Sequence, residues 1–443
     1  YYNYQLGPYS NNENHFSFSA FSYLQQIPST ELVLFSFAGE EFSSVKDNHA
    51  NGFESFRGGI AASPHDNIFV FGNFILDERK AEDAGYTGKK WRGFAGGVED
   101  AFVYYKSGSI DILVGRFASF WGPRHSLALS SRNSMDGFEY TFHWGRLALS
   151  YRLAKLDRLK LFNDITSATE SSDLSINRYF AGHRLDIFLS KKLRIGFYET
   201  IIFGGAGRQL DLYYLNPIIF FHSYQLNQDL NDNTFLGFDF TFKPKPGIKF
   251  YGQFLVDDFQ IDKKTQADQE PNQYGLIIGT HFIDVAPSFD IKLEYNRITN
   301  RTFNQILEHN RYQVNNRLIS GAFGNDYDLI LVTLNRWFND HLTVSLVYSY
   351  MRQGEGQVTD DWTEPWFDIE GDYSEPFPTG IVERTNGLSI GVKGFAFNHF
   401  FFDIETGLNK INNYRHIDTD NRSLPFIKLN ISTFLSSSLN VDK

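Results

Sequence analysis

One short segment combines an arginine with a tryptophan in a pattern that could bind a sugar. A strand-like stretch ends near Arg116 and is followed by the bend Trp121-Gly122-Pro123. Proline lacks the backbone N–H that a sheet ladder needs, so the chain should leave the sheet at this bend. One interpretation is a structural corner at a rim, and the other is an inward loop that presents Arg116 and Trp121 to a ligand. We predict that residues 121–131 fold inward or cap the rim.

A second candidate is a carboxylate on an apolar side of a strand. Counted in steps of two, Glu199 falls on the same side as Leu193 and Phe197. A charge on such a face is costly if that face contacts lipid. We therefore expect Glu199 either at a rim or turned inward by a β-bulge, with Arg184 as a possible partner. A structural ion pair and a ligand contact both remain open.

A third group of polar residues lies on two neighbouring strand-like segments. Alternation places Asp239 and Gln253 on one polar side. Asp257 and Asp258 could bind a cation, but they lie where a strand leaves the sheet, and a solvated pair of acids is the simpler interpretation. We expect no metal site and no cofactor.

The most unusual connecting segment runs from about residue 353 to 384. It carries Trp362, Trp366 and Tyr373 among many carboxylates. Such a mixture suits stacking on sugars with hydrogen bonds to hydroxyls, and exposed aromatic residues also anchor protein partners. A third interpretation is a self-packed cover with no ligand. The candidate ligand-binding residues are Arg116, Trp121, Arg184, Glu199, Asp239, Gln253, Asp257, Trp362, Trp366 and Tyr373.

The elements that must position these residues are β-strands, because polar and apolar residues alternate with a period of two. Between Phe289 and Arg297, one side carries Phe289, Ile291, Leu293 and Tyr295, and the other carries Asp290, Lys292, Glu294 and Asn296. The clearest segments lie at about 31–42, 67–77, 92–105, 109–118, 136–143, 145–154, 183–190, 192–203, 234–243, 247–257, 273–284, 288–298, 326–337, 341–352, 386–396, 398–409 and 424–435.

Composition indicates what surrounds these strands. Aromatic residues make up 17% of the 443 residues, including 45 Phe and 24 Tyr. No stretch reaches the roughly 18–20 apolar residues of a membrane-spanning helix. In lipid, only helices and closed barrels pair all of their backbone groups, so a membrane protein without such helices must be a closed barrel. The aromatic girdles of a barrel account for the many Phe and Tyr residues. Tyr295, Phe250 and Phe240 should face lipid, while Lys292 and Glu294, like Asp239 and Gln253, face the interior.

We thus predict an all-β fold, a transmembrane antiparallel outer-membrane β-barrel of about eighteen strands, since bacterial single-chain barrels have an even number. Residues 1–443 should form one domain. Long polar connections at about 78–91, 155–175, 259–272, 300–324 and 353–384 should be extracellular loops, opposite tight turns such as Pro244-Lys245-Pro246-Gly247.

Several function classes are excluded or disfavoured. The net charge of −11 argues against a nucleic-acid partner. The absence of cysteine excludes disulfides and thiol nucleophiles. The His-Glu-x-x-His motif does not occur. The Gly-x-Ser-x-Gly pattern at 387–391 lies inside a predicted strand rather than at the strand-to-helix turn of a nucleophile elbow, so an enzyme is not expected.

Several of these motifs, taken together, resemble one known family. They are Gly-Arg-x-x-x-x-Trp-Gly-Pro at 115–123, His183-Arg184-Leu185, Arg194-Ile195-Gly196-Phe197-Tyr198-Glu199, Asn216-Pro217, Leu236-Gly237-Phe238-Asp239 and Tyr251-Gly252-Gln253. The string is similar to the capsule-assembly Wzi family and to its gliding-motility relative RemB of the Bacteroidota. Capsule proteins of this family carry an N-terminal helical bundle, whereas residues 1–50 here read as loops and strands. Arg124 also replaces a usual small residue, so the RemB-like branch is the closer match.

The resemblance implies a non-enzymatic outer-membrane barrel. It would bind or anchor surface polysaccharide, or scaffold a cell-surface complex of the motility or secretion type. Its partners would be outer-membrane lipid and lipopolysaccharide, a surface glycan and other outer-membrane or surface proteins. The alternatives are a channel for small polar solutes and, less well supported, an outer-membrane hydrolase.

Overall fold

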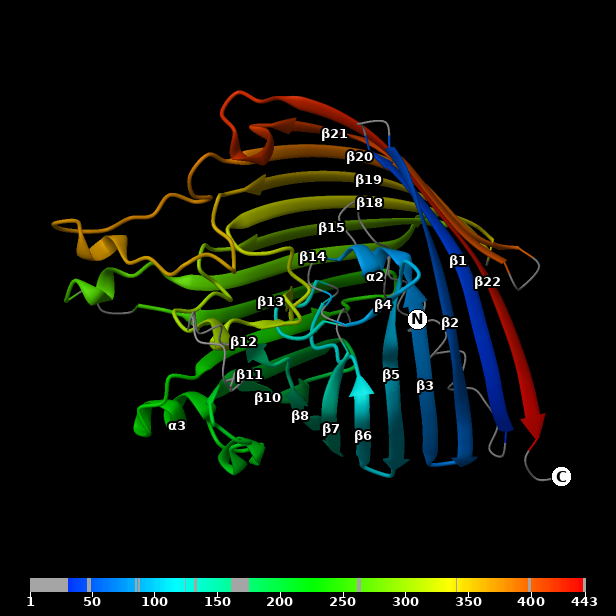
Figure 1. Cartoon of the computed structure of the whole chain (residues 1–443), viewed down its shortest axis with the longest axis horizontal. Coiled ribbons are helices and arrows are strands. Elements are labelled where there is room, and N and C mark those ends of the chain that lie inside the picture. The colour runs from blue at the N-terminus through cyan, green and yellow to red at the C-terminus, as the bar shows by residue number, and fades with distance from the viewer. Residues whose placement is uncertain are drawn as a thin grey trace, which may run out of the picture.

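Each strand of the wall pairs in antiparallel fashion with the next one along the chain, and the first pairs with the last. In the computed structural model, β1 bonds to β2 on one side and to β22 on the other, which closes the sheet. The result is an eighteen-stranded antiparallel barrel (Figure 1). The structure describes residues 31–45, 49–83, 86, 88–123, 125–130, 134–160, 175–260, 264–339, 341–396 and 400–440.

The wall strands follow the order of the chain. They are β1 (Glu31–Val45), β2 (His49–His65), β3 (Ile68–Asp77), β5 (Phe94–Ser107), β6 (Ile110–Phe117), β7 (Met135–Trp144), β8 (Leu147–Lys155), β10 (Ser175–Phe188), β11 (Leu193–Ala206), β12 (Asn233–Phe242), β13 (Ile248–Asp258), β14 (Gln273–Ala286), β15 (Phe289–Ile298), β18 (Tyr327–Asn339), β19 (Leu342–Gln353), β20 (Glu383–Ala396), β21 (Phe400–Asn412) and β22 (Arg422–Asn440).

The remaining elements are short. Two-residue strands β4 (Lys90–Trp91) and β9 (Leu159–Lys160) extend the sheet, and β16 (Gln313–Val314) pairs with β17 (Arg317–Leu318). The α-helices are α2 (Glu78–Glu82) and α3 (Phe221–Asn227), and the 3-10 helices are η2 (Leu212–Leu215), η3 (Ala267–Gln269), η4 (Glu308–Asn310), η5 (Pro365–Phe367) and η6 (Tyr414–His416). Within the described ranges, no helix is long and apolar enough to span a membrane.

Alternation along the strands separates an apolar outside from a polar inside. Phe250 and Leu293 are exposed on the outside, whereas Asp239, Gln253 and Glu294 are buried on the inside. The predicted orientations of Phe240 and Tyr295 are confirmed as well, because each shares its strand side with exposed apolar neighbours. The outer face therefore contacts lipid, which tolerates apolar side chains and no unpaired backbone groups.

The predicted count of eighteen strands is confirmed, and one strand was missed. The segment His49–His65, which forms β2, carries glycine and alanine at many positions, so its alternation is weak in the sequence. β10 also begins at Ser175, earlier than the predicted strand at 183. A strand rich in small residues shows little alternation in its sequence. β2 is nevertheless paired along most of its length with β1 and β3.

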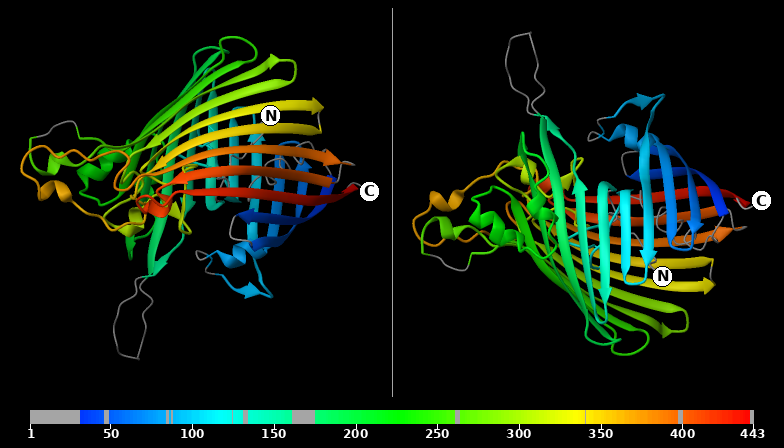
Figure 2. Two further views of the ribbon diagram at one scale, coloured as in Figure 1. Left: turned by 90° about the horizontal axis from the view of Figure 1, so that it is seen from above. Right: turned by 90° about the horizontal axis from the view of Figure 1, so that it is seen from below.

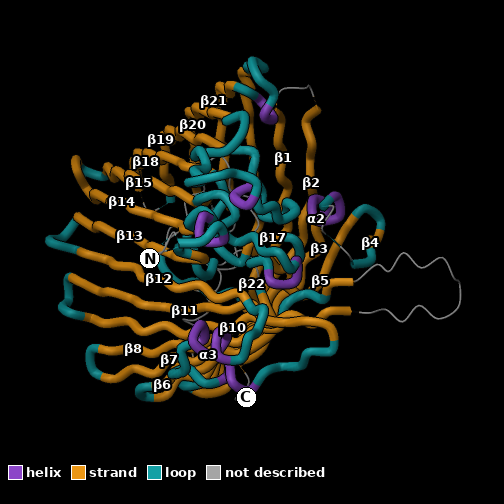
Figure 3. Tube along the Cα trace, turned by 90° about the vertical axis from the view of Figure 1, so that its left-hand side faces the viewer, coloured by secondary structure: helices purple, strands orange, loops and turns teal. Residues whose placement is uncertain are grey.

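Long connections gather at one end of the barrel, opposite tight turns. They span residues 78–93, 118–134, 156–174, 207–232, 259–272, 299–326, 354–382 and 413–421, with gaps where residues lie outside the described ranges. We call this the loop end and the other the turn end. Figure 2 shows α3 and the 354–382 loop projecting beyond the strands at the loop end. Seen toward that end, loops lie across the ring of strands (Figure 3).

A charge placed on the outer face should test this orientation. Ile390 on β20 is 48% exposed and faces lipid near the middle of the wall. Ile390→Arg should destabilise the barrel by about 2–4 kcal/mol, and Asn386→Arg, closer to the loop end of the same strand, by about 0–1 kcal/mol. Urea unfolding in lipid vesicles measures both. Equal effects of the two substitutions would contradict the assigned lipid face.

Candidate functional site

The segment that follows β6 enters the barrel, as predicted. Trp121 forms an isolated bridge to Leu129, and the residues between them turn back within the interior. Trp121, Leu127 and Leu129 are buried in a cluster with side chains from the inner face of the wall. Arg124 and Ser131, which belong to the predicted inward segment, lie outside the described residues.

Two glycines make room for this inward turn. Gly122 has φ +117, and a Cβ there would lie 2.7 Å from the Nε2 atom of Gln253. Opposite, a Cβ on Gly182 of β10 would lie 3.0 Å from the ring of Trp121. A larger residue at either position would push the loop off the wall, because the space is filled, and at Gly122 the positive φ is also one that L residues rarely adopt.

Inward polar side chains of the wall hold the loop in place. Gln253 accepts a hydrogen bond from the backbone N–H of Leu127 at 2.8 Å and donates to the carbonyl of Trp121 at 3.3 Å. Glu294 contacts His125 Nδ1 at 2.5 Å and accepts from the Tyr251 hydroxyl at 2.6 Å. The interior placement of Gln253 is confirmed, and its contacts are to the protein's own loop.

A second loop, 299–326, packs against the first inside the barrel. The Tyr312 hydroxyl donates to the carbonyl of Ala128 at 2.8 Å, and the N–H of Gly321 donates to Ser126 at 2.6 Å. Arg178 on β10 donates to the carbonyls of His309, Arg311 and Gln313 at 2.7, 2.8 and 3.0 Å. The inward arginine of β10 therefore fixes this second loop as Gln253 fixes the first.

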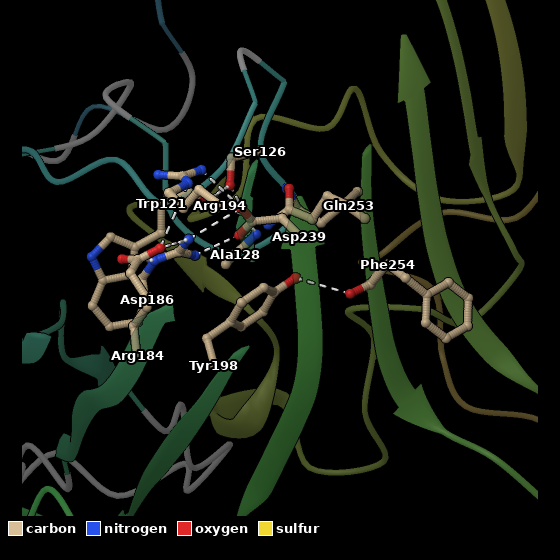
Figure 4. Close-up of polar contacts among 11 residues, drawn as sticks. Trp121, Ser126, Ala128, Arg184, Asp186, Arg194, Tyr198, Asp239, Gln253 and Phe254 are labelled. Carbon is tan, nitrogen blue, oxygen red and sulfur yellow. Dashed lines mark hydrogen bonds and ion pairs between the residues drawn. The ribbon is translucent and has the colours of Figure 1, made fainter. Parts of the chain in front are cut away.

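Toward the turn end, four charged side chains form an ion cluster on the inner wall (Figure 4). Arg184 donates to both oxygens of Asp186 at 2.8 and 2.7 Å and to Asp239 at 2.5 and 3.1 Å. Arg194 donates to Asp239 at 2.9 Å. Arg184 and Asp239 are both buried. Two cations balance two anions, so the geometry is that of a structural ion cluster.

The predicted pairing of Arg184 with Glu199 is wrong. Glu199 follows Tyr198 and precedes Thr200, which both face the interior, so its side chain points outward. The β10–β11 register is continuous through His183↔Glu199, with no bulge. The parity read from the sequence was right, and the inward turn that we expected does not occur.

Glu199 is only 2% exposed on the outer face because the 207–232 loop covers it. Its two oxygens accept from the backbone N–H groups of Phe221 and His222 at 2.8 Å each, at the start of α3. His183 Nε2 lies 3.2 Å from it. Around it, Tyr151, Ala181, Ile201, Phe203, Tyr214 and Phe221 form an apolar cluster between the wall and the loop. A charge on the outer wall is thus shielded from lipid by the chain itself.

Arg116 is not brought to Trp121. It sits on the outer side of β6, beside exposed Val114, and forms an ion pair with Asp136 of β7 at 2.9 Å. Neighbouring Phe117 points the other way, into an inner apolar cluster. The inward placement is therefore confirmed for Trp121 and is wrong for Arg116, which belongs to the strand before the bend.

The expectation of a solvated acid at Asp257 is also wrong. Its Oδ2 accepts from the N–H of Phe303 at 2.6 Å, and its Oδ1 is buried without a hydrogen-bond partner. Asp257 thus anchors the start of the 299–326 loop. In the described parts of the chain, no group of three or more His, Asp or Glu residues could hold a metal ion.

Aromatic side chains of the 354–382 loop surround an ion pair at the mouth of the barrel. Arg301 pairs with Glu375, and its guanidinium lies 5.9 Å from the Trp362 ring and 5.3 Å from the Trp366 ring. Tyr373 lies 6.2 Å from Trp366 between ring centroids. The structure therefore brings together three predicted site residues, and we call Arg301, Trp362, Trp366, Tyr373 and Glu375 the mouth cluster.

Neighbouring loops fix the mouth cluster from below. Trp366 is 1% exposed, and its carbonyl accepts from Gln266. Asp326 accepts from the N–H groups of Gly356 and Thr379 at 3.1 Å each. Burial raises the pKa of Asp326 above its usual value. Burial, followed by the charge of Asp258, raises the pKa of nearby Glu270 to about 7. Buried polar groups of neighbouring loops therefore hold the 354–382 loop in one position.

Sequence reading missed the residues that hold the loops. Arg178, His125 and Asp326 were not singled out, and Glu294 was predicted only to face inward. Arg178 and Glu294 could have been found from the sequence, because each is a charged residue on the inner side of a long strand. No local pattern marks His125 or Asp326, because their partners lie far away in the sequence.

The packed interior predicts a low conductance. We expect planar-bilayer recordings of the wild type to show little steady current, because the 118–134 and 299–326 loops occupy the interior. Replacing residues 119–130 with a short Gly-Ser linker should increase the current, since the contacts to Gln253 and Glu294 are lost. The same replacement at 414–420, on a loop at the rim, is the control. Large stable steps in the wild type would contradict this assignment.

The covered carboxylate predicts a role for Glu199 in holding the 207–232 loop. Glu199→Ala leaves two backbone N–H groups without their acceptor, at a cost of about 1–3 kcal/mol each. We expect protease cleavage within 207–232 to become about tenfold faster while the barrel stays resistant. Glu199→Gln keeps one acceptor oxygen and should have a smaller effect. Unchanged cleavage in the alanine variant would show that the apolar cluster alone holds the loop.

Comparison with known proteins agrees with this architecture. The sequence matches the family described as capsule assembly protein Wzi over residues 72–424. The solved structure of Wzi from Escherichia coli is described as an outer membrane protein involved in group 1 capsule assembly and a carbohydrate-binding β-barrel. It is 15% identical with a TM-score of 0.59, over 94% of this chain and 86% of that one.

Two further solved structures share the fold. OprD of Pseudomonas aeruginosa is 10% identical with a TM-score of 0.50, over 93% of this chain and 98% of that one. OccAB2 of Acinetobacter baumannii is 9% identical with a TM-score of 0.51, over 91% and 98%. Identities this low show the fold alone. No curated protein sequence matches. The family match spans most of the chain, and the closed barrel carries the lipid face that such a protein needs. The protein is therefore a member of the Wzi capsule-assembly family of outer-membrane β-barrels.

Proposed function

We propose that this barrel binds and anchors a surface polysaccharide through the mouth cluster at its loop end. The observation that carries the proposal is the Arg301–Glu375 ion pair, whose guanidinium lies 5.9 Å from the Trp362 ring and 5.3 Å from the Trp366 ring. Fixed charged groups beside flat rings suit a sugar, which offers hydroxyls at its edge and C–H groups on its faces. The carbohydrate-binding relative of the same family supports the assignment.

The cluster divides into residues that can reach a ligand and residues that position them. Trp362 and Tyr373 are half-buried, and several carboxylates nearby are exposed, among them Asp361, Glu364 and Asp372. Buried Trp366 packs beneath them and is assigned a positioning role. Since the loop is already held by Gln266 and Asp326, little ordering entropy is lost when a glycan binds.

Of the other predicted ligand residues, Trp121, Arg184, Asp239, Gln253 and Asp257 contact the protein itself. They are proposed to act on binding only by keeping the interior loops, and hence the mouth, in place. A channel for small solutes is the less favoured function, because the same contacts fill the interior with packed loops. A hydrolase is the least favoured function, because the Gly-x-Ser-x-Gly pattern at 387–391 lies within the strand β20 and not at a strand-to-helix turn.

The test is binding of surface polysaccharide, purified from the native strain, to the barrel in detergent or nanodiscs. Trp362→Ala and Tyr373→Ala should each weaken binding about tenfold, or about 1.4 kcal/mol. Trp91→Ala is the matched control, because Trp91 is an exposed tryptophan on a different loop with an arginine over its ring. Unchanged binding in both cluster variants, or an equal loss in the control, would reject the mouth cluster as the glycan site.

A second candidate function, scaffolding of a surface complex of the motility type, has one observation in its favour. Phe367 is 52% exposed and Ile369 45% exposed on the same loop, among acidic residues. Exposed apolar anchors in a polar rim are typical of a protein interface. Phe367→Ala combined with Ile369→Ala should then remove co-purifying proteins while glycan binding is retained. If no co-purifying protein depends on these two residues, the scaffold function of this loop is rejected.

A further inference from the structure

Three arginines lie in one register on the outer face of the barrel, near the loop end. Arg297 on β15 is opposite Asp328 on β18, which is opposite Arg352 on β19. Arg352 is in turn opposite Arg384 on β20. Each position is the second from the loop end of its strand. We call Arg297, Asp328, Arg352 and Arg384 the outer row.

These side chains point away from the interior. On β15, Asn296 and Ile298 are buried inside, so Arg297 between them points outward. On β20, Thr385 is buried inside, and Arg384 next to it is exposed. On β18, Tyr327 and Leu329 belong to the inner cluster, which places Asp328 outside. The outer row is therefore on the same face as the lipid-contacting residues.

The outer row carries more positive charge than the protein neutralises. Arg352 donates to Asp328 through Nε at 2.8 Å, which uses the one carboxylate of the row. Arg384 forms no ion pair with any described residue. The guanidinium of Arg297 lies 3.8 Å from the ring centroid of Phe377, and its Nε has no hydrogen-bond partner. Two guanidinium groups thus remain without a counter-charge in the described structure.

The rows beneath it locate the membrane boundary. One step down, the register passes through Tyr295, Ile330, Tyr350 and Asn386. One step further it passes through Leu293, Val332, Tyr348 and Leu388, of which Leu293 and Leu388 are apolar and exposed. Tyrosine side chains thus lie between the arginines and the apolar wall, as they do at a membrane interface. The outer row is therefore at headgroup depth on the loop side of the membrane.

We propose that the outer row binds the phosphate groups of a phosphorylated glycolipid of the outer leaflet. Guanidinium groups present paired N–H donors that match phosphate oxygens, and such charge-assisted bonds are about twice as strong as neutral ones. The acyl chains of the same molecule would lie along Leu293 and Leu388, so one ligand contacts both layers. This site lies outside the mouth and is independent of the proposed polysaccharide function.

The turn end provides a matched control. Arg336 of β18 is also outward, since it lies between Asn335 and Trp337, which contacts inward Asp290. Its guanidinium lies 5.0 and 4.7 Å from the ring centroids of Phe289 and Phe338. The turn end lies on the inner-leaflet side, where this glycolipid is not expected. Arg336→Gln therefore removes a guanidinium group from the outer face, but at the turn end of the barrel instead of the loop end.

The test is the amount of lipid A that co-purifies with the barrel from a Gram-negative host, measured by mass spectrometry per mole of protein. Arg384→Gln should lower retention, and Arg297→Gln combined with Arg384→Gln should lower it about tenfold, as expected for lost charge-assisted contacts. Arg384→Lys should restore part of it, and Arg336→Gln should leave it unchanged. The heat-dependent shift of folded barrels on gels shows that every variant is assembled.

Native mass spectrometry of the wild type then separates phosphate recognition from acyl-chain binding. Added diphosphorylated lipid A should bind about tenfold more tightly than the dephosphorylated form. Equal binding of the two forms, full retention in the double variant, or an equal loss in Arg336→Gln would each overturn the proposal.

Discussion

The pairing of β1 with β22 closes the hydrogen-bond ladder, and every other feature of the protein depends on that closure. In a lipid core no water is present to satisfy a free strand edge, so an open sheet of this size would leave a full row of N–H and C=O groups unpaired. Closure removes both edges at once. It also creates an interior, and the period of two in each strand then assigns each side chain to lipid or to the interior.

Several inward polar side chains of the wall form hydrogen bonds to the loops that occupy the interior. Gln253, Glu294 and Arg178 each offer side-chain donors or acceptors to loop backbone. The loop backbone would otherwise be buried unsatisfied inside the barrel, at a cost of about 1–3 kcal/mol per group. The wall and the loops thus satisfy one another. The mouth cluster is held at fixed positions as a consequence, since the 299–326 loop that carries Arg301 is anchored at both the wall and the neighbouring loops.

The strand pattern was predictable from the sequence because lipid on one side makes alternation strong, as between Phe289 and Arg297. The prediction failed at β2, where glycine and alanine occupy many positions on both faces, because such small side chains do not indicate whether a position faces lipid or the interior. Contacts between loop and wall were not predictable. The partner of Glu199 is the start of α3, twenty-two residues away, and that of His125 is Glu294. A period along one strand contains no information about which distant segment covers it.

Glu199 and Asp328 show how a charge is accommodated on the outer face. Glu199 is covered by the 207–232 loop and satisfied by two backbone N–H groups. Asp328 is paired with Arg352 near the loop end, where headgroups and water are close. Each carboxylate is given hydrogen-bond donors by the protein, so the constraint set by lipid is met in both places by different means. Arg384 shares the register of Asp328 and has no such partner among the described residues, so its counter-charge would come from outside the described chain. The headgroup layer is the nearest source of anions at that depth.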